Sequence, residues 1–83
     1  MTDYTYTVKW YRRGSTYGHH STYDSIVDAS HCFKSELWDN VCVIVTRSDD
    51  KLMAKFDRYS NGNVLFVDDP LFNIDFDISL LDI

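Results

Sequence analysis

Apolar and polar residues alternate with a period of two near both ends of the chain, which is the pattern of a strand with one buried face. In the closing stretch, residues 71–83, the apolar row consists of Phe72, Ile74, Phe76, Ile78 and Leu80. Near the start, residues 3–11 carry a second row, consisting of Tyr4, Tyr6, Val8 and Trp10. Both stretches are predicted to be strands that turn these rows toward a core, with a C-terminal arm as the alternative for residues 71–83.

A helical period lies between these two stretches. Residues Arg12 to Ser21 are polar and have no period, so a loop is predicted there. Apolar or small residues then recur three and four positions apart, at Ile26, Ala29, Ser30, Phe33 and Leu37. This spacing predicts one amphipathic helix over about residues 22–39, with Asn40 as its C-terminal stop.

Three further strands are predicted before the closing stretch. A β-branched run from Val41 to Thr46 suits a central strand, and alternation resumes at Leu52. Asn61-Gly62 is a strong signal for a hairpin turn, and residues 64–67 form the strand that follows it. The predicted order is β-α-β-β-β-β, and the first two strands, if adjacent, pair in parallel. One helix covers only one face of a sheet, so residues 1–83 are predicted to form a single two-layer α+β domain with a four- to five-stranded, mainly antiparallel sheet.

The chain lacks the features of secreted and membrane-spanning proteins. Its first residues have no apolar signal-peptide core, and the longest apolar run, Val41 to Val45, is far shorter than a membrane span. Cys32 and Cys42 are too few for a disulfide framework. We therefore expect a cytoplasmic protein with reduced thiols and no contact with membranes.

The net charge of −5 lies in the last quarter of the chain. Residues 1–63 contain eight acidic and eight basic residues, whereas residues 64–83 contain five aspartates and no lysine or arginine. Direct binding to nucleic acid is driven by an excess of basic residues, which this chain does not have. Direct nucleic-acid binding is therefore not expected as the main function.

No residues are spaced as in a metal or catalytic site. His19-His20 and His31-Cys32 are adjacent pairs whose side chains point in different directions, unlike the spaced pairs that hold zinc. Ser, His and Asp occur without a strained turn that would frame a nucleophile, and there is no glycine-rich phosphate loop. We expect a protein without enzyme activity, metal or cofactor.

Two surfaces remain as candidates for binding. The first, the acidic surface, consists of Asp68, Asp69, Asp75, Asp77 and Asp82. On a strand, Asp75 and Asp77 would lie roughly 6.5–7 Å apart, which is close to the spacing of neighbouring phosphates. Such a surface is attracted to a channel lined by Lys and Arg and competes there with DNA or RNA. A plainer role for the same charges is to solvate an edge strand and prevent unwanted pairing.

The second surface, the basic-aromatic patch, consists of Lys9, Tyr11, Arg12, Arg13 and Tyr17. Cations combined with aromatic rings are typical of single-strand binding sites. The plainer interpretation is a solvated strand end followed by a loop.

The order of four segments, YTYTVKWYRRG, TYDSIVDASHCF, VCVIVT and LMAKFDRYSNGNVLFV, together with the small size and acidic charge, resembles small phage-encoded inhibitor proteins of the anti-CRISPR type. The resemblance covers the whole chain and implies stoichiometric binding without catalysis, in the cytoplasm of a host cell. We therefore expect an inhibitor that acts as a DNA mimic. Its acidic surface would block the basic nucleic-acid-binding groove of a CRISPR-Cas-like or other nucleic-acid-handling complex. The alternatives are a nucleic-acid-binding protein that uses the basic-aromatic patch, and a structural or regulatory homodimer.

Overall fold

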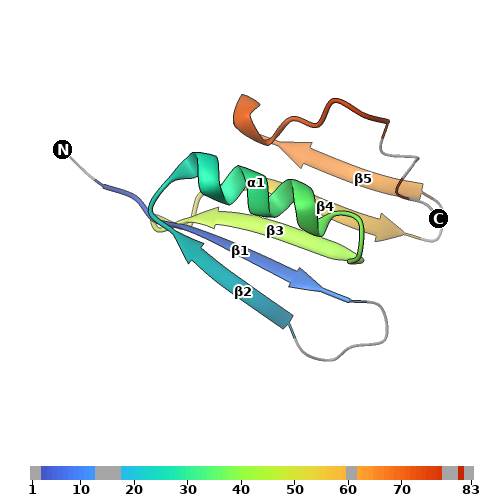
Figure 1. Ribbon diagram of the computed structural model, residues 1–83, viewed down its shortest axis with the longest axis horizontal. Helices are drawn as coiled ribbons and strands as arrows, with labels where there is room; N and C mark the ends of the chain where they lie inside the picture. Colours follow the sequence, from blue (N-terminus) through green and yellow to red (C-terminus); the bar gives the residue numbers. More distant parts are fainter. Residues whose placement is uncertain (1–2, 13–17, 60–61, 78–80, 82–83) are drawn as a thin grey trace.

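The computed structural model describes residues 3–12, 18–59, 62–77 and 81. One helix, α1 (Ile26–Glu36), packs on one face of a five-stranded antiparallel sheet (Figure 1). This confirms the predicted two-layer α+β class. The strands are β1 (Tyr6–Tyr11), β2 (Gly18–Tyr23), β3 (Cys42–Arg47), β4 (Leu52–Tyr59) and β5 (Gly62–Val67), and their order in the sheet is β2-β1-β3-β4-β5.

The predicted loop over residues 12–21 is wrong for its second half, because β2 begins at Gly18 and pairs antiparallel with β1. Strand β2 lies at the edge of the sheet and half-buries only Ser21 and Tyr23, so it has no row of apolar residues that would mark it in the sequence. The element order is therefore β-β-α-β-β-β. With β2 inserted, β1 pairs antiparallel with β3, and the expected parallel pairing of β1 with the strand after the helix does not form.

Helix α1 is shorter at its start than predicted, because β2 extends to Tyr23. Its apolar stripe is as expected: Ala29, Phe33 and Leu37 are fully buried. The predicted end at about residue 39 is wrong, because α1 ends at Glu36 with Leu37 as its C-cap, and the expected stop residue, Asn40, lies beyond that cap. This side chain is buried, and its Nδ2 donates hydrogen bonds to the Glu36 carbonyl oxygen at 2.6 Å and to the Glu36 carboxylate at 2.9 Å.

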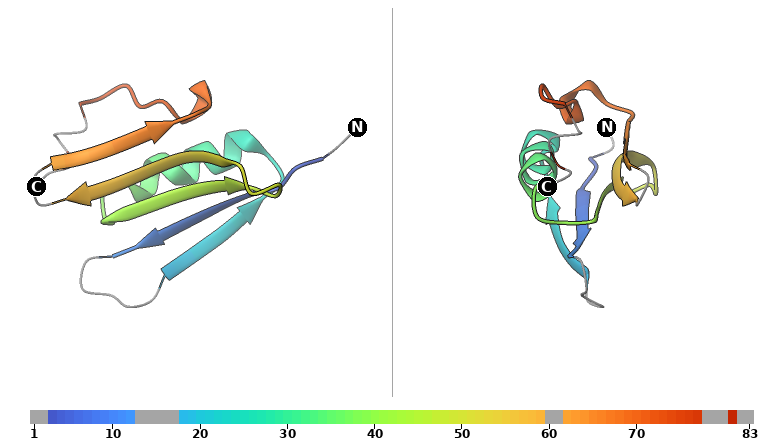
Figure 2. Two further views of the ribbon diagram at one scale, coloured as in Figure 1. Left: turned by 180° about the vertical axis from the view of Figure 1, so that it is seen from behind. Right: turned by 90° about the vertical axis from the view of Figure 1, so that its right-hand side faces the viewer.

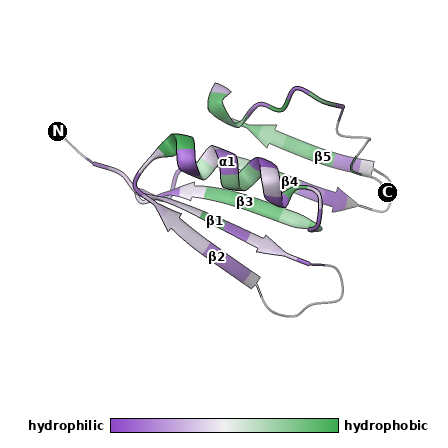
Figure 3. Ribbon diagram, in the orientation of Figure 1, coloured by the Kyte–Doolittle hydropathy of each residue, from purple (hydrophilic) through white to green (hydrophobic). Residues whose placement is uncertain are grey.

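The core lies between α1 and the sheet. The inward row of β1 is the predicted one, with Val8 fully buried and with Tyr6 and Trp10 packed against the core. The central strands β3 and β4 contribute further buried side chains to the core, namely Val43, Val45, Met53, Ala54 and Phe56. Strands β3 and β5 are mostly hydrophobic and β2 is mostly hydrophilic (Figure 3), in keeping with the edge position of β2.

After β5 the chain leaves the sheet and forms an arm, which we define as residues 68–77 and 81. Asp69 caps a short 3-10 helix, η1 (Pro70–Phe72), and residues 73–77 form no strand. The arm alternative therefore replaces the predicted fifth strand over these residues. The physical reason lies at Pro70, which has no N–H to donate to a strand ladder and begins the η1 turn.

The predicted alternation of burial on the arm is nevertheless correct where it is described. Phe72 is fully buried with its ring edge-to-face against Phe33, the centroids 5.7 Å apart, and Ile74 and Phe76 pack against the core. Asn73, Asp75 and Asp77 are exposed. Ile78 and Leu80 lie outside the described residues. The arm lies on the same side of the sheet as α1 (Figure 2), so the opposite face of the sheet is left uncovered by other described elements.

Arg58 of β4 connects the sheet to both the arm and the end of α1. Its guanidinium donates hydrogen bonds to the carbonyl oxygen of Leu81 in the arm and to that of Leu37 at the end of α1, the latter at 3.4 Å. In the part of the chain that the structure describes, no helix is long and apolar enough to cross a membrane.

Candidate functional site

Acidic residues predominate in the helix and arm segments, whereas basic residues predominate in the strands. The helix segment, residues 24–40, and the arm residues 69–77 contain seven acidic residues and one basic residue, Lys34. The five strands contain four basic residues and one acidic residue, Asp57. Because α1 and the arm lie on the same side of the sheet, their acidic residues share one layer, which we call the helix–arm face. The negative charge of the last quarter of the chain is thus extended by the helix.

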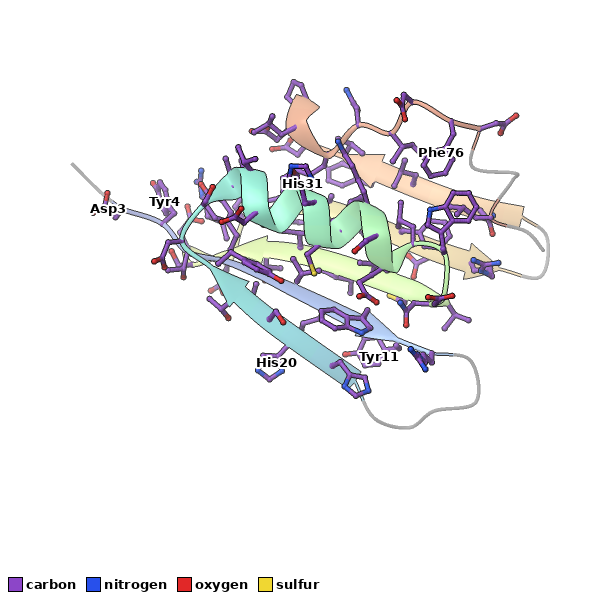
Figure 4. The ribbon with its side chains drawn as sticks, in the orientation of Figure 1. Asp3, Tyr4, Tyr11, His20, His31 and Phe76 are labelled. Atoms are coloured by element: carbon purple, nitrogen blue, oxygen red, sulfur yellow. The ribbon has the colours of Figure 1, made fainter. Side chains whose placement is uncertain are left out.

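An exposed tryptophan lies at the junction of the helix and the arm. Trp38 is 48% exposed, and its ring stacks on Phe76 with centroids 5.0 Å apart and planes 25° apart. Figure 4 shows Phe76 directed from the arm toward the end of α1 where Trp38 lies. Asp39, next to Trp38, and Asp75 and Asp77, on either side of Phe76, are exposed. The helix–arm face therefore combines a large aromatic side chain with carboxylates.

The five aspartates of the predicted acidic surface do not form one row. Asp68 lies at the end of β5 and pairs with Lys51 at 3.1 Å, and Asp69 Oδ1 accepts a hydrogen bond from the Leu71 N–H at 3.0 Å. Asp75 and Asp77 are exposed on the arm, and because the arm is not a strand there, the spacing expected for a strand does not apply to them. Asp82 lies outside the described residues. Their joint role in partner binding stays a prediction.

Of the basic-aromatic patch, Lys9 and Tyr11 lie on the opposite, uncovered face of the sheet, because they alternate with the inward row of β1. Lys9 pairs across the ladder with His20 on one side and Ile44 on the other. Lys9, Tyr11 and Gly18 line a hollow of about 270 Å³. A Cβ atom on Gly18 would come within 2.4 Å of Tyr11 Cε1, so the Tyr11 ring uses the space that glycine leaves. Arg12 is exposed beyond the end of β1, and Arg13 and Tyr17 lie outside the described residues.

A groove runs between α1 and the paired strands β1 and β2, and we call it the α1–β2 groove. Its volume is about 690 Å³, and its lining includes Trp10, Tyr23, Asp28, Cys32 and Glu36. The hydrogen bond between the Cys32 thiol and the Tyr23 hydroxyl raises the pKa of Tyr23, and burial raises the pKa of Cys32. Both groups are therefore neutral at physiological pH, and the negative charges of the groove come from Asp28 and Glu36.

Among residues 3–12, 18–59, 62–77 and 81, no three His, Cys, Asp or Glu side chains gather as a metal site. Burial, followed by a hydrogen bond to Asp57, raises the pKa of Cys42 to about 11. A nucleophilic thiol needs a lowered pKa, so the described surroundings of both cysteines keep them unreactive.

Sequence reasoning missed Trp38 and the helix carboxylates Asp28, Glu36 and Asp39 as members of a candidate site. The helix charges were hidden because the first 63 residues have no net charge in total. A signal for Trp38 was present, since this residue follows Leu37, the last member of the apolar stripe, and so falls outside the stripe.

Neither a protein-family model, nor a curated protein sequence, nor a solved structure matches this chain.

Proposed function

We propose that this protein is a non-enzymatic inhibitor whose helix–arm face occupies the basic nucleic-acid-binding groove of a partner protein. One observation carries the proposal: the helix segment, residues 24–40, and the arm residues 69–77 bring seven acidic residues and one basic residue to one side of the sheet, where the Trp38 side chain is 48% exposed. Carboxylates steer the encounter with a basic groove and set its salt dependence. A partly exposed tryptophan is the type of side chain that most often anchors a protein interface.

The resemblance to small phage-encoded inhibitors of the anti-CRISPR type suggests the class of partner. A CRISPR-Cas-like effector, or another nucleic-acid-handling complex, holds its nucleic acid in a groove lined by Lys and Arg. An acidic layer bound in that groove would exclude the nucleic acid without any chemical step.

The proposal is tested by capturing partners from a bacterial lysate on the immobilised protein, with and without competing DNA or RNA. The captured protein should be a nucleic-acid-binding protein that an oligonucleotide displaces. The double variant Asp75→Asn/Asp77→Asn should bind it more slowly and with a weaker dependence on salt. Trp38→Ala should weaken binding by about thirtyfold, the loss of roughly 2 kcal/mol expected at an interface anchor.

Asp50→Asn is the matched control. Asp50 is exposed in the turn after β3 and has a positive φ of 69°, a conformation that asparagine also adopts readily. Asp50→Asn removes one negative charge, against two in the double variant, at a place away from the helix–arm face, and binding should stay close to that of the native protein. If Asp75→Asn/Asp77→Asn and Trp38→Ala bind as the native protein does, the helix–arm face is not the interface.

Two other functions have some support from the uncovered face of the sheet. Lys9 and Tyr11 share the hollow described above, which favours single-stranded nucleic acid as a second candidate. A gel shift at low salt that shows no retardation would remove it.

Val64 and Phe66 of β5 are 53% and 46% exposed, which favours a homodimer as a third. Light scattering that gives the monomer mass at micromolar concentration would remove that one.

A further inference from the structure

The outer edge of β2 offers backbone groups for pairing. In an antiparallel sheet, alternate residues of a strand hydrogen-bond to the neighbour on one side and then to the neighbour on the other. The Ser48 N–H donates to the Thr5 carbonyl oxygen at 2.9 Å, which fixes this alternation for β1. Thr7, Lys9 and Tyr11 then bond to β3, and Tyr6, Val8 and Trp10 bond to β2. On β2, the residues that turn their N–H and C=O groups outward are therefore His20 and Thr22, together with Gly18 at the start.

This edge carries none of the usual protection against pairing. Sheet edges in proteins are commonly blocked by lysine and other charged residues, by proline or by a bulge. Strand β2 has the sequence GHHSTY, with no acidic residue, lysine, arginine or proline, and its register with β1 is continuous over all six residues. Figure 1 shows β2 as the last strand of the sheet, with no described element beyond it.

The α1–β2 groove lies directly beside this edge, on the helix side of β2. Ser21 and Tyr23 of β2 line it, and Asp28 and Glu36 of α1 bring two carboxylates to it. Trp10 and Tyr23 add two aromatic rings, against which a cation can pack. At one end the groove meets a hollow of about 320 Å³ that Glu36 shares with Arg12 and His19. The positive charge of Arg12 disfavours a second cation there, so the Asp28 end is the better place for one.

We propose that an extended segment of the partner protein adds to the outer edge of β2 as a sixth strand and places an arginine or lysine side chain in the α1–β2 groove. This inference rests on the proposed function, because it names the kind of partner segment that the acidic helix–arm face binds. Strand addition supplies main-chain hydrogen bonds from His20 and Thr22. Every second side chain of the added strand then faces the helix side, where Asp28 and Glu36 favour a positive charge.

The probe for the test is a fluorescein-labelled peptide of alternating arginine and valine, and fluorescence anisotropy measures its binding to the native protein. Replacement of arginine by glutamine in the peptide should weaken binding by about tenfold. Two further peptides carry N-methyl groups on alternate residues, in opposite phase. Only one phase turns its N–H groups toward β2, so one methylated peptide should lose binding and the other should keep it.

Variants of the protein test the same contacts. His20→Pro removes one outward N–H without removing a hydrogen bond to β1. It should weaken the binding of the peptide by about fivefold. Asp28→Asn/Glu36→Gln should weaken the binding of the arginine peptide and leave the binding of the glutamine peptide unchanged. Asp50→Asn, which replaces an exposed carboxylate in the turn after β3 and outside the groove lining, is the control and should bind as the native protein does.

The outcomes separate the two proposals. If both methylated peptides bind equally well, or if neither the arginine-to-glutamine change nor His20→Pro has an effect, the strand-addition inference is overturned. The proposed function still stands in that case if Asp75→Asn/Asp77→Asn and Trp38→Ala weaken capture of the partner. If the peptide binds as expected but those variants capture the partner normally, the helix–arm face fails as the interface and the strand site remains.

Discussion

Replacement of Phe72 by alanine tests whether the arm belongs to the folding core. The Phe72 side chain is fully buried, with its ring edge-to-face against Phe33 of α1 at 5.7 Å and 84°. Truncation of a buried phenylalanine to alanine lowers the free energy of unfolding by about 3–5 kcal/mol. The aromatic pair accounts for about 0.5–1.5 kcal/mol of that loss. A domain of this length has a total stability of roughly 4–12 kcal/mol, so Phe72→Ala should leave the protein marginally stable.

Urea unfolding, followed by far-UV circular dichroism and by the fluorescence of Trp10 and Trp38, measures this loss. The control is Leu71→Ala, one residue away, because Leu71 is 42% exposed and its truncation should cost less than about 1 kcal/mol. The two probes should shift together in Phe72→Ala, since Trp38 reports on the arm and circular dichroism reports on the sheet. The reasoning is refuted if Phe72→Ala costs no more unfolding free energy than Leu71→Ala. It is also refuted if the fluorescence transition moves to lower urea while the circular dichroism transition stays at the urea concentration found for the native protein.

Two further predictions concern ionisable groups. Hydrogen bonds from Arg47 lower the pKa of Asp49 from 3.8 to about 2, so the native state binds this proton less readily than the unfolded chain does. The pair therefore stabilises the fold above the unfolded pKa, and that contribution is lost as the pH falls through the folded pKa. The difference in unfolding free energy between the native protein and Asp49→Asn should shrink as urea titrations move from pH 5 toward pH 2; a constant difference would contradict the assignment. For Cys42, a pKa of about 11 leaves only about 0.1% thiolate at pH 8. Iodoacetamide should therefore modify Cys42 far more slowly in the folded protein than in urea, and equal rates by mass spectrometry would refute the burial argument.

The two-layer class and most of the core were predictable from the sequence, because burial imposes its period directly on the residues. The stripe that includes Phe33 and Leu37 marked the helix, and the row that includes Val8 and Trp10 marked β1. Strand β2 was not predictable in this way. Its hydrogen bonds to β1 are backbone contacts, and an edge strand that half-buries only Ser21 and Tyr23 leaves almost no pattern in its side chains.

The closing stretch shows the converse case. Phe72, Ile74 and Phe76 alternate in burial as predicted, yet no strand forms over residues 73–77. Phe72 lies in η1 and residues 75–76 form a bend, so the alternation reports that every second side chain contacts a core and not that the chain forms a strand ladder. The candidate site was predictable only in part, because the layer that unites Asp28, Asp39, Asp75 and Asp77 exists only once α1 and the arm lie on one side of the sheet.

Positions of the arm that contact the core and positions that are exposed to solvent differ in how freely they can change during evolution. Phe72, Ile74 and Phe76 hold the arm to the core, whereas the exposed positions 73 and 75 can change without loss of those contacts. Related chains could therefore alter the charge of the arm, and with it their choice of partner, while the fold stays intact. An alignment of such chains would show conservation at every second position and would imitate the signature of a strand where the chain forms none.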